Sequence, residues 1–204
     1  MRNSAATELA IWRRAVAELY GEVRETYDPR LAWAKWVDGR NQIFKEMAQS
    51  PLDAAQRGRP HGLSYYDYDI DLRTVGRINY EVEPELYSVE LGDEGTLKYQ
   101  RVAMVHFRLP SGSFRLNLYW ILGYGGGLFL PFKDLTNGGE TFGGGRYLYD
   151  TIKGADLGVS WEAITLDFNF AYNPSCAYSE RWLCPLAPDE NELPLAVTAG
   201  EKLF

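Results

Sequence analysis

The residues best suited to chemistry lie in the last third of the chain. Asp167 and Asn169 stand two positions apart in an alternating apolar stretch, so a strand there would point both side chains to one face. A carboxylate on an enclosed sheet face needs a partner, because an unpaired buried charge is unstable. Arg146 is the expected partner, since a guanidinium can bind a carboxylate through two parallel hydrogen bonds. On a solvated face, Asp167 would be an ordinary surface residue.

Other polar residues stand close to this pair in the sequence. Tyr172 and Asn173 precede Pro174, which favours an extended backbone and gives both side chains a fixed direction. A small-molecule pocket needs only a few convergent polar groups of these kinds. The candidate ligand-binding residues are therefore Glu140, Arg146, Asp167, Asn169, Tyr172 and Asn173. Asp167 or Glu140 could act as a general base if burial raised its pKa.

Three kinds of function fit these residues. The first is a small-molecule pocket, binding or hydrolytic, at one end of a β structure. The second is a non-catalytic structural or interaction module, whose Asp, Arg and Asn network fastens the long C-terminal loop onto the sheet. The third is a hard-cation site made of Asp134, Glu140, Asp167 and side-chain amides. We expect the pocket ahead of the structural network, and both ahead of the cation site.

The low counts of histidine and cysteine exclude several other sites. With 2 His and 2 Cys, the chain cannot build a multi-histidine metal centre or a four-cysteine zinc site. We expect His61 and His106 to bind no metal, and we expect no cofactor. A disulfide between Cys176 and Cys184 is geometrically possible but not indicated. Their loop contains no His or Lys that would lower a thiol pKa, so we expect unreactive, non-catalytic thiols.

Composition and charge exclude further classes of function. The net charge is −7, which disfavours binding to a phosphate backbone, and no apolar run approaches the roughly 20 residues of a membrane span. The N-terminus lacks the apolar core of a signal peptide. The sequence therefore predicts a soluble, cytoplasmic protein whose partner is a small molecule, with neither nucleic acid nor membrane as a partner.

Glycine is concentrated in residues 123–158, which hold 11 of the 20 glycines. Such density permits positive φ and close approach of the backbone to another group. The stretch lacks the Gly-x-Gly-x-x-Gly and Lys-Ser/Thr patterns of phosphate-binding loops. We therefore expect tight turns between short strands in preference to an anion cradle.

The N-terminal part of the chain has the apolar spacing of helices. Apolar residues recur at steps of three and four from Leu9 to Val23, which predicts a helix over about residues 5–26. Asp28 followed by Pro29 has the pattern of a cap and a first helical position, which predicts a second helix over about residues 29–48.

From about residue 62 the apolar period becomes two. Alternation on both sides of the turn at 110–113 predicts a hairpin, Gly92–Gly95 predicts an earlier one, and residues 164–170 predict a further strand. The fold class expected is mainly β (α+β), an antiparallel β-sandwich or partly open barrel with two N-terminal helices packed on it. Residues 1–204 would form a single domain, with a helical segment at 1–50 and an antiparallel β body at 62–204.

Several motifs resemble those of a known family. In the C-terminal half they are Pro131–Thr136, Glu140–Phe142, Gly145–Leu148, Leu166–Asn169, Ala171–Pro174, Cys176–Tyr178, Cys184–Leu186, Glu190–Asn191 and Ala199–Lys202; earlier in the chain they are Phe44, Ser50–Leu52 and Gly62–Tyr66. Together they resemble the bacterial and archaeal family called domain of unknown function 1684. The resemblance implies one domain but no established reaction or cofactor. Its members generally carry Arg where this chain has Phe170, and a second Pro where it has Ser175.

Overall fold

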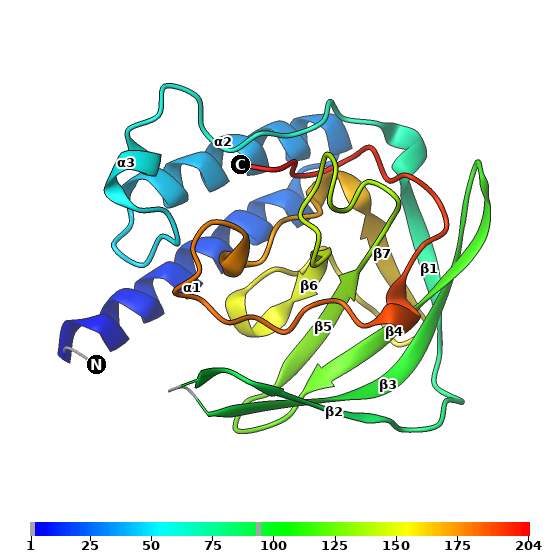
Figure 1. Cartoon of the computed structure of the whole chain (residues 1–204). Coiled ribbons are helices and arrows are strands. Elements are labelled where there is room, and N and C mark those ends of the chain that lie inside the picture. The colour runs from blue at the N-terminus through cyan, green and yellow to red at the C-terminus, as the bar shows by residue number, and fades with distance from the viewer. Residues whose placement is uncertain (1–2, 93–94) are drawn as a thin grey trace.

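Two long helices lie across a strongly curved sheet in the computed structural model, which describes residues 3–92 and 95–204 (Figure 1). Helix α1 spans Asn3–Glu25 and α2 spans Pro29–Glu46, which confirms the predicted pair. Asp28 caps α2, because its carboxylate accepts hydrogen bonds from the N–H groups of Arg30 at 2.8 Å and Leu31 at 3.1 Å. A short helix that was not predicted, α3, spans Ala54–Arg57.

All strands belong to one antiparallel sheet, in the order β6-β5-β4-β3-β1-β7, with β2 also paired to β3. The bounds are β1 Arg73–Asn79, β2 Leu86–Glu90, β3 Thr96–Leu109, β4 Gly112–Ile121, β5 Gly127–Phe132, β6 Arg146–Asp150 and β7 Ala163–Asp167. Short 3-10 turns are η1 Ile70–Leu72, η3 Thr151–Lys153, η4 Phe168–Phe170, η5 Ser175–Ala177 and η6 Asp189–Asn191. The predicted antiparallel fold is confirmed, in its partly open barrel form.

The local predictions for the strands have different outcomes. The hairpin around residues 110–113 is confirmed, since β3 pairs with β4 as far as Leu109 opposite Gly112. The pairing of β2 with β3 is also antiparallel, but residues 93–94 of the expected turn lie outside the described residues. The strand predicted over 164–170 ends at Asp167, whose carboxylate accepts the N–H of Asn169 at 3.1 Å and starts the turn η4.

Side chains connect the two edges of the half-barrel, β6 and β7. The Tyr149 hydroxyl, from β6, lies 2.7 Å from the carbonyl oxygen of Thr165 in β7 and 3.0 Å from that of Gly158. In addition, β6 forms an isolated bridge between Tyr147 and Tyr172, in the segment that follows β7. The Tyr149 hydroxyl and the backbone bridge between Tyr147 and Tyr172 thus connect β6 with β7 and the segment after it.

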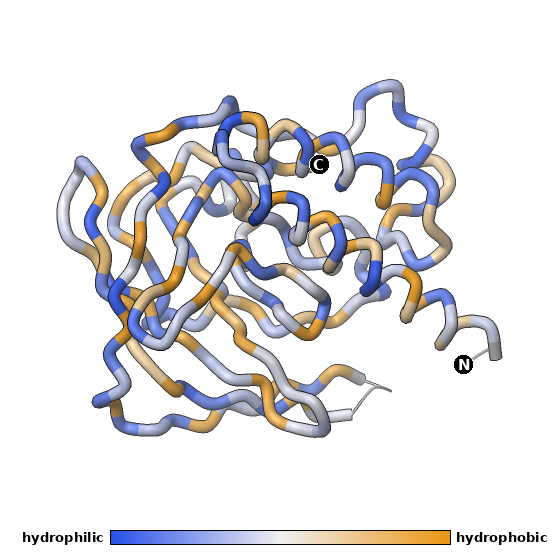
Figure 2. Tube along the Cα trace, turned by 180° about the vertical axis from the view of Figure 1, so that it is seen from behind, coloured by the Kyte–Doolittle hydropathy of each residue, from blue (hydrophilic) through white to orange (hydrophobic). Residues whose placement is uncertain are grey.

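Two of the three apolar clusters include strands of the sheet. The larger one packs the two long helices against the sheet and contains the fully buried Trp36 of α2 together with Leu116 and Leu118 of β4. The smaller one is aromatic and contains Tyr119 of β4 and Tyr147 of β6. Leu118 and Tyr119, which are neighbours in β4, therefore pack in different clusters, because successive side chains of a strand point to opposite faces. Figure 2 shows hydrophobic and hydrophilic residues interspersed along the whole trace. Among the described residues, no helix has a stretch apolar enough to cross a membrane.

Replacing Tyr149 by Phe tests the closure of the half-barrel. The variant leaves both carbonyls without their phenol donor, so the free energy of unfolding should fall by about 1 kcal/mol. Urea denaturation measures the change. Tyr124→Phe is the matched control, because this tyrosine is fully exposed. Equal effects of the two substitutions would show that the Tyr149 contact adds nothing to the closure.

Candidate functional site

Arg146 pairs with Asp134, so the predicted pair of Arg146 with Asp167 is wrong. Its Nη2 lies 2.8 Å from Oδ2 of Asp134, and both side chains are completely buried. The reason is the register of the sheet. Arg146 pairs with Phe132 across the β5–β6 ladder, which places Asp134, two residues further on, beside the guanidinium. Asp167 ends β7 on the other edge of the sheet.

The remaining contacts of Arg146 hold the C-terminal segment, residues 197–201. Its guanidinium donates to the carbonyl oxygens of Val197 at 2.9 Å, of Glu201 at 3.3 Å, and of Ala199. The Val197 N–H donates in turn to Asp134 Oδ1 at 3.2 Å. Gly145, just before Arg146, has a φ of 87°, and a Cβ there would lie 2.5 Å from the Phe132 carbonyl oxygen. These contacts give Arg146 and Asp134 a structural role.

A second buried ion pair joins the same segment to α2. Arg40 Nη2 lies 2.9 Å from Glu201 Oε2. That carboxylate also accepts the Asn173 N–H at 2.9 Å and the Tyr178 hydroxyl. The ring of Tyr172 lies under the Arg40 guanidinium, 4.9 Å away. The structure therefore brings the predicted residues Tyr172 and Asn173 to Arg40 and Glu201, two charges that the sequence analysis missed.

A small cavity of about 50 Å³ lies beside this ion pair. Among the described residues, three buried polar atoms near it lack a hydrogen-bond partner, namely Tyr20 Oη, Arg40 Nε and Asn173 Oδ1. The volume corresponds to one or two water molecules and is well below that of metabolite pockets. We therefore do not assign a ligand to this cavity.

Asp167 occupies a different polar site, at the end of β7. It stands opposite Arg73 in the β1–β7 register, and its Oδ2 lies 3.4 Å from Arg73 Nε and 3.3 Å from the Tyr68 hydroxyl. Asn169 Nδ2 donates to Oδ1 at 2.8 Å. Asp167 and Asn169 thus lie together through the turn η4, and the predicted strand alternation that would point both to one face is wrong, because β7 ends at Asp167. Asn169 also binds both backbone polar groups of Asp69.

Burial raises the pKa of Asp167 to about 6. Hydrogen bonds from Asn169 and Tyr68 and the charge of Arg73 all favour the carboxylate, and the loss of hydration exceeds their combined effect. A carboxyl with this pKa can take up and release protons near neutral pH. Such groups are concentrated in functional sites.

The Asp167 cleft, as we call it, has a volume of about 320 Å³ and lies between the α1–α2 junction and the end of β7. It is lined by Val23, Arg24, Thr26, Tyr27, Pro29, Ala32, Arg73, Leu157, Gly158, Thr165, Asp167 and Phe170. Arg24 and Arg73 give it two partly exposed positive charges. The ring of Phe170 packs on Trp36, with centroids 5.2 Å apart. The family that the motifs resemble generally has Arg at this position.

Glu140 lies apart from both sites and is exposed. Its backbone carbonyl accepts the N–H of Leu203 at 2.9 Å. Burial, together with the nearby negative charge of Glu140, raises the pKa of Tyr66 to about 12. The three carboxylates expected for a hard cation do not converge. Over residues 3–92 and 95–204, no three His, Cys, Asp or Glu side chains form a group that could hold a metal ion. The absence of metal at His61 and His106 stays a prediction.

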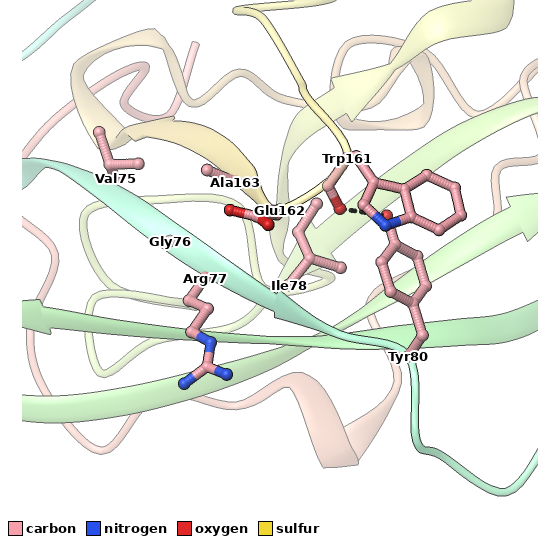
Figure 3. Close-up of a pocket in the computed structure, with 8 residues that line it drawn as sticks. All are labelled: Val75, Gly76, Arg77, Ile78, Tyr80, Trp161, Glu162 and Ala163. Carbon is pink, nitrogen blue, oxygen red and sulfur yellow. Dashed lines mark hydrogen bonds between the residues drawn. The ribbon is translucent and has the colours of Figure 1, made fainter.

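A groove of about 560 Å³ runs along β1 beside residues 161–163 (Figure 3). Tyr80 stacks on Trp161 at a centroid distance of 5.1 Å and donates its hydroxyl to the Trp161 carbonyl oxygen at 2.9 Å. Glu162 and Arg77 also line the groove, and it is broadly open to solvent. The six predicted residues lie elsewhere.

Cys176 and Cys184 are free thiols, and both are partly exposed. The Cys176 thiol and, to a lesser extent, the charge of Lys153 in η3 lower the pKa of Cys184, whereas the pKa of Cys176 is raised above its ordinary value. Their own loop contains no His or Lys, and the expectation of non-catalytic thiols stays a prediction. The cation comes from a turn more than twenty residues earlier in the chain, which the local sequence cannot indicate.

Asp134→Asn tests the buried pair of Arg146. The substitution leaves the guanidinium buried without its counter-charge, so the free energy of unfolding should fall by about 3–5 kcal/mol. Asp189→Asn is the control, because Asp189 forms an exposed pair with Lys133 at 2.7 Å. This control should leave the urea midpoint nearly unchanged. Similar midpoints for both variants would contradict the structural role of the buried pair.

Comparisons with known proteins agree with the motifs. The family described as "Protein of unknown function (DUF1684)" matches residues 60–202. The solution NMR structure of an uncharacterized protein from Haloarcula marismortui is 39% identical, with a TM-score of 0.62, and the match covers 81% of this chain and 89% of that one. A search of the curated proteins finds no match.

The family match extends from the segment before η1 to the C-terminal segment, so it includes Asp134, Arg146, Asp167 and both cysteines. The helices α1 and α2 precede it. This chain belongs to the DUF1684 family.

Proposed function

We propose that the Asp167 cleft binds a small organic molecule that carries both an acidic group and a hydrogen-bond donor. The observation that carries this proposal is the position of Asp167, whose buried carboxyl, with a pKa of about 6, lies in the wall of a cleft that two arginines also line. The volume of about 320 Å³ is within the range of small-molecule sites.

The polar groups of the cleft suggest separate tasks. Arg24 and Arg73 would attract and orient an anionic group, since a guanidinium binds carboxylate or phosphate through paired hydrogen bonds. Asp167 would accept a hydrogen bond from a hydroxyl or amine of the same molecule. Its pKa also suits it to take a proton from that group, as a general base in hydrolysis would. Gly158 and Thr165, which also line the cleft, are held by the Tyr149 hydroxyl.

The purely structural hypothesis has support from other residues. Arg146 makes its contacts with Asp134 and the C-terminal segment, and Asn173 bonds Glu201 and the carbonyl of Lys202. These contacts fit a network that fastens the C-terminal segment. Asp167 differs from them, because its cationic partner Arg73 is 41% exposed and faces the cleft. We therefore restrict the ligand-binding proposal to the Asp167 cleft.

A thermal-shift screen with hydroxy and amino carboxylates tests the proposal. Because any molecule that binds only the folded state stabilises it, at least one probe should raise the melting temperature. Asp167→Asn and Arg73→Gln should each abolish that shift.

The control for the screen is Glu162→Gln, a carboxylate that lines the groove of Figure 3 instead. It should keep the full shift. The proposal fails if no probe stabilises the protein, or if the shift survives in Asp167→Asn.

The pH dependence of stability tests the state of Asp167 independently of any ligand. Its pKa is about 6 in the folded chain against 3.8 ordinarily, so the folded state binds more protons between these values. Its contribution to stability is thus fully present below pH about 4 and is lost as the pH rises through about 6.

Asp167→Asn removes this titration. Between pH about 4 and neutral pH, the wild type loses the contribution of Asp167, whereas the variant has none to lose. The free energy of unfolding of the variant should therefore rise by about 3 kcal/mol relative to that of the wild type over this range. Urea denaturation at a series of pH values measures it. Parallel pH profiles of the two proteins would mean that Asp167 has an ordinary pKa.

A further inference from the structure

An exposed aromatic pair stands at one end of the groove of Figure 3. Trp161 is 79% exposed and Tyr80 is 46% exposed, and their rings stack with centroids 5.1 Å apart at an interplanar angle of 27°. Two hydrogen bonds of 2.9 Å fix this part of the chain on β1, because the Tyr80 hydroxyl donates to the Trp161 carbonyl oxygen and the Ile78 N–H donates to that of Glu162. With Tyr80 on one side only, the indole offers solvent a fixed flat surface on which another ring can stack.

Basic side chains form a row that begins in the same groove. Arg77 of β1 lies opposite His106 of β3, and His106 lies opposite Arg115 of β4, so all three side chains point to one face of the sheet. Arg108, two residues after His106 in β3, points to that face as well. All four residues are exposed. Since neighbouring strands lie about 4.8 Å apart, the row from Arg77 to Arg115 extends over about 10 Å.

The arginines of this row have no counter-charge in the fold. Over residues 3–92 and 95–204, no ion pair includes Arg77, Arg108 or Arg115. Glu162 also lines the groove, but Figure 3 shows the Arg77 side chain directed away from it. Like charges on neighbouring strands do not stabilise a sheet, so stability does not explain the row. In a chain with a net charge of −7, such a face is a local exception that attracts anions.

We propose that this face binds a nucleoside polyphosphate, with its base stacked on Trp161 and its phosphates on the row of Arg77, His106 and Arg115. Stacking on an aromatic side chain suits any planar base. A guanidinium binds phosphate through paired hydrogen bonds, and the imidazole of His106 adds an N–H donor. The groove has a volume of about 560 Å³, which is within the range of small-molecule sites. The site is separate from the Asp167 cleft, whose lining residues are different ones.

The arrangement of charges gives the ligand one direction. Glu162 follows Trp161 in the chain, so its carboxylate repels phosphates from the aromatic end of the groove and can accept a hydrogen bond from a ribose hydroxyl. A single phosphate would meet only part of a row of about 10 Å, and a neutral ring would not use the arginines at all. A ring joined to a chain of phosphates is therefore the class of molecule that uses the whole site.

Calorimetric titration of the full-length protein with ATP, at low salt and without divalent cations, tests the proposal. ATP should bind at a ratio of one to one, and its affinity should fall as salt is added, because the phosphate contacts are screened. Adenosine and inorganic tripolyphosphate each carry only one part of the ligand, so both should bind at least about tenfold more weakly than ATP. The proposal is overturned if ATP gives no saturable binding, or if tripolyphosphate alone binds as tightly.

Variants of exposed residues locate the bound ATP. Trp161→Ala should weaken ATP binding at least about tenfold and leave the affinity for tripolyphosphate unchanged, because only the base contacts the indole. The double variant Arg77→Gln, Arg115→Gln should weaken the binding of both probes. Unchanged melting temperatures without ligand would show that these variants are folded.

The matched control is Arg14→Gln, which removes an exposed arginine of α1. It changes the net charge by one unit far from the groove in the sequence and should keep the affinity of the wild type for ATP. Equal weakening in Arg14→Gln and in the double variant would show unspecific attraction and overturn the proposal. Wild-type affinity for ATP in Trp161→Ala or in the double variant would overturn it as well, because the ATP would then lie elsewhere.

Discussion

The buried guanidinium of Arg146 holds the C-terminal segment, residues 197–201, against the edge strand β6. Arg146 is completely buried, and its two Nη atoms find their acceptors within the protein, in Asp134 and in the carbonyls of residues 197–201. The segment that it holds carries Glu201, which pairs with Arg40 of α2. Removing either charge would leave its partner buried and alone, whereas the intact pair specifies one position of the segment. The helices and the edge strand β6 are therefore connected through the last residues of the chain.

The sequence predicts those parts of the fold that local periodicity determines. The two helices, the cap at Asp28 and the β3–β4 hairpin follow from spacing within about twenty residues. The end of β7 was mispredicted, because Asp167 forms a hydrogen bond with the Asn169 N–H and turns the backbone out of the strand. Phe168 still follows the alternation of an apolar strand, so hydrophobicity alone carries no sign of that turn.

The sequence indicated which polar residues form buried hydrogen bonds, but it did not indicate which partners they bind. Polar residues in apolar strands indicate buried hydrogen bonding, and Asp167, Asn169 and Asn173 all have such bonds. Their partners depend on which strands are neighbours. Arg146 meets Asp134 because β5 and β6 pair, and Asp167 meets Arg73 because β1 and β7 pair. Both pairings join segments that are distant in the chain, so one sequence gives no signal for either contact.

The energetics of Asp167 separate a chemical role from a structural one. A carboxylate kept only to bind neighbours would be expected to have a lowered pKa and to stabilise the fold at neutral pH, yet burial raises this pKa to about 6. An asparagine could accept the same hydrogen bonds from Asn169 without an ionised group to desolvate. The ionised carboxyl therefore contributes less to stability near neutral pH than its protonated form does at low pH, which agrees with the ligand role that we propose for it. Arg146 shows the contrasting case, with its counter-charge and carbonyl acceptors all supplied from within the fold.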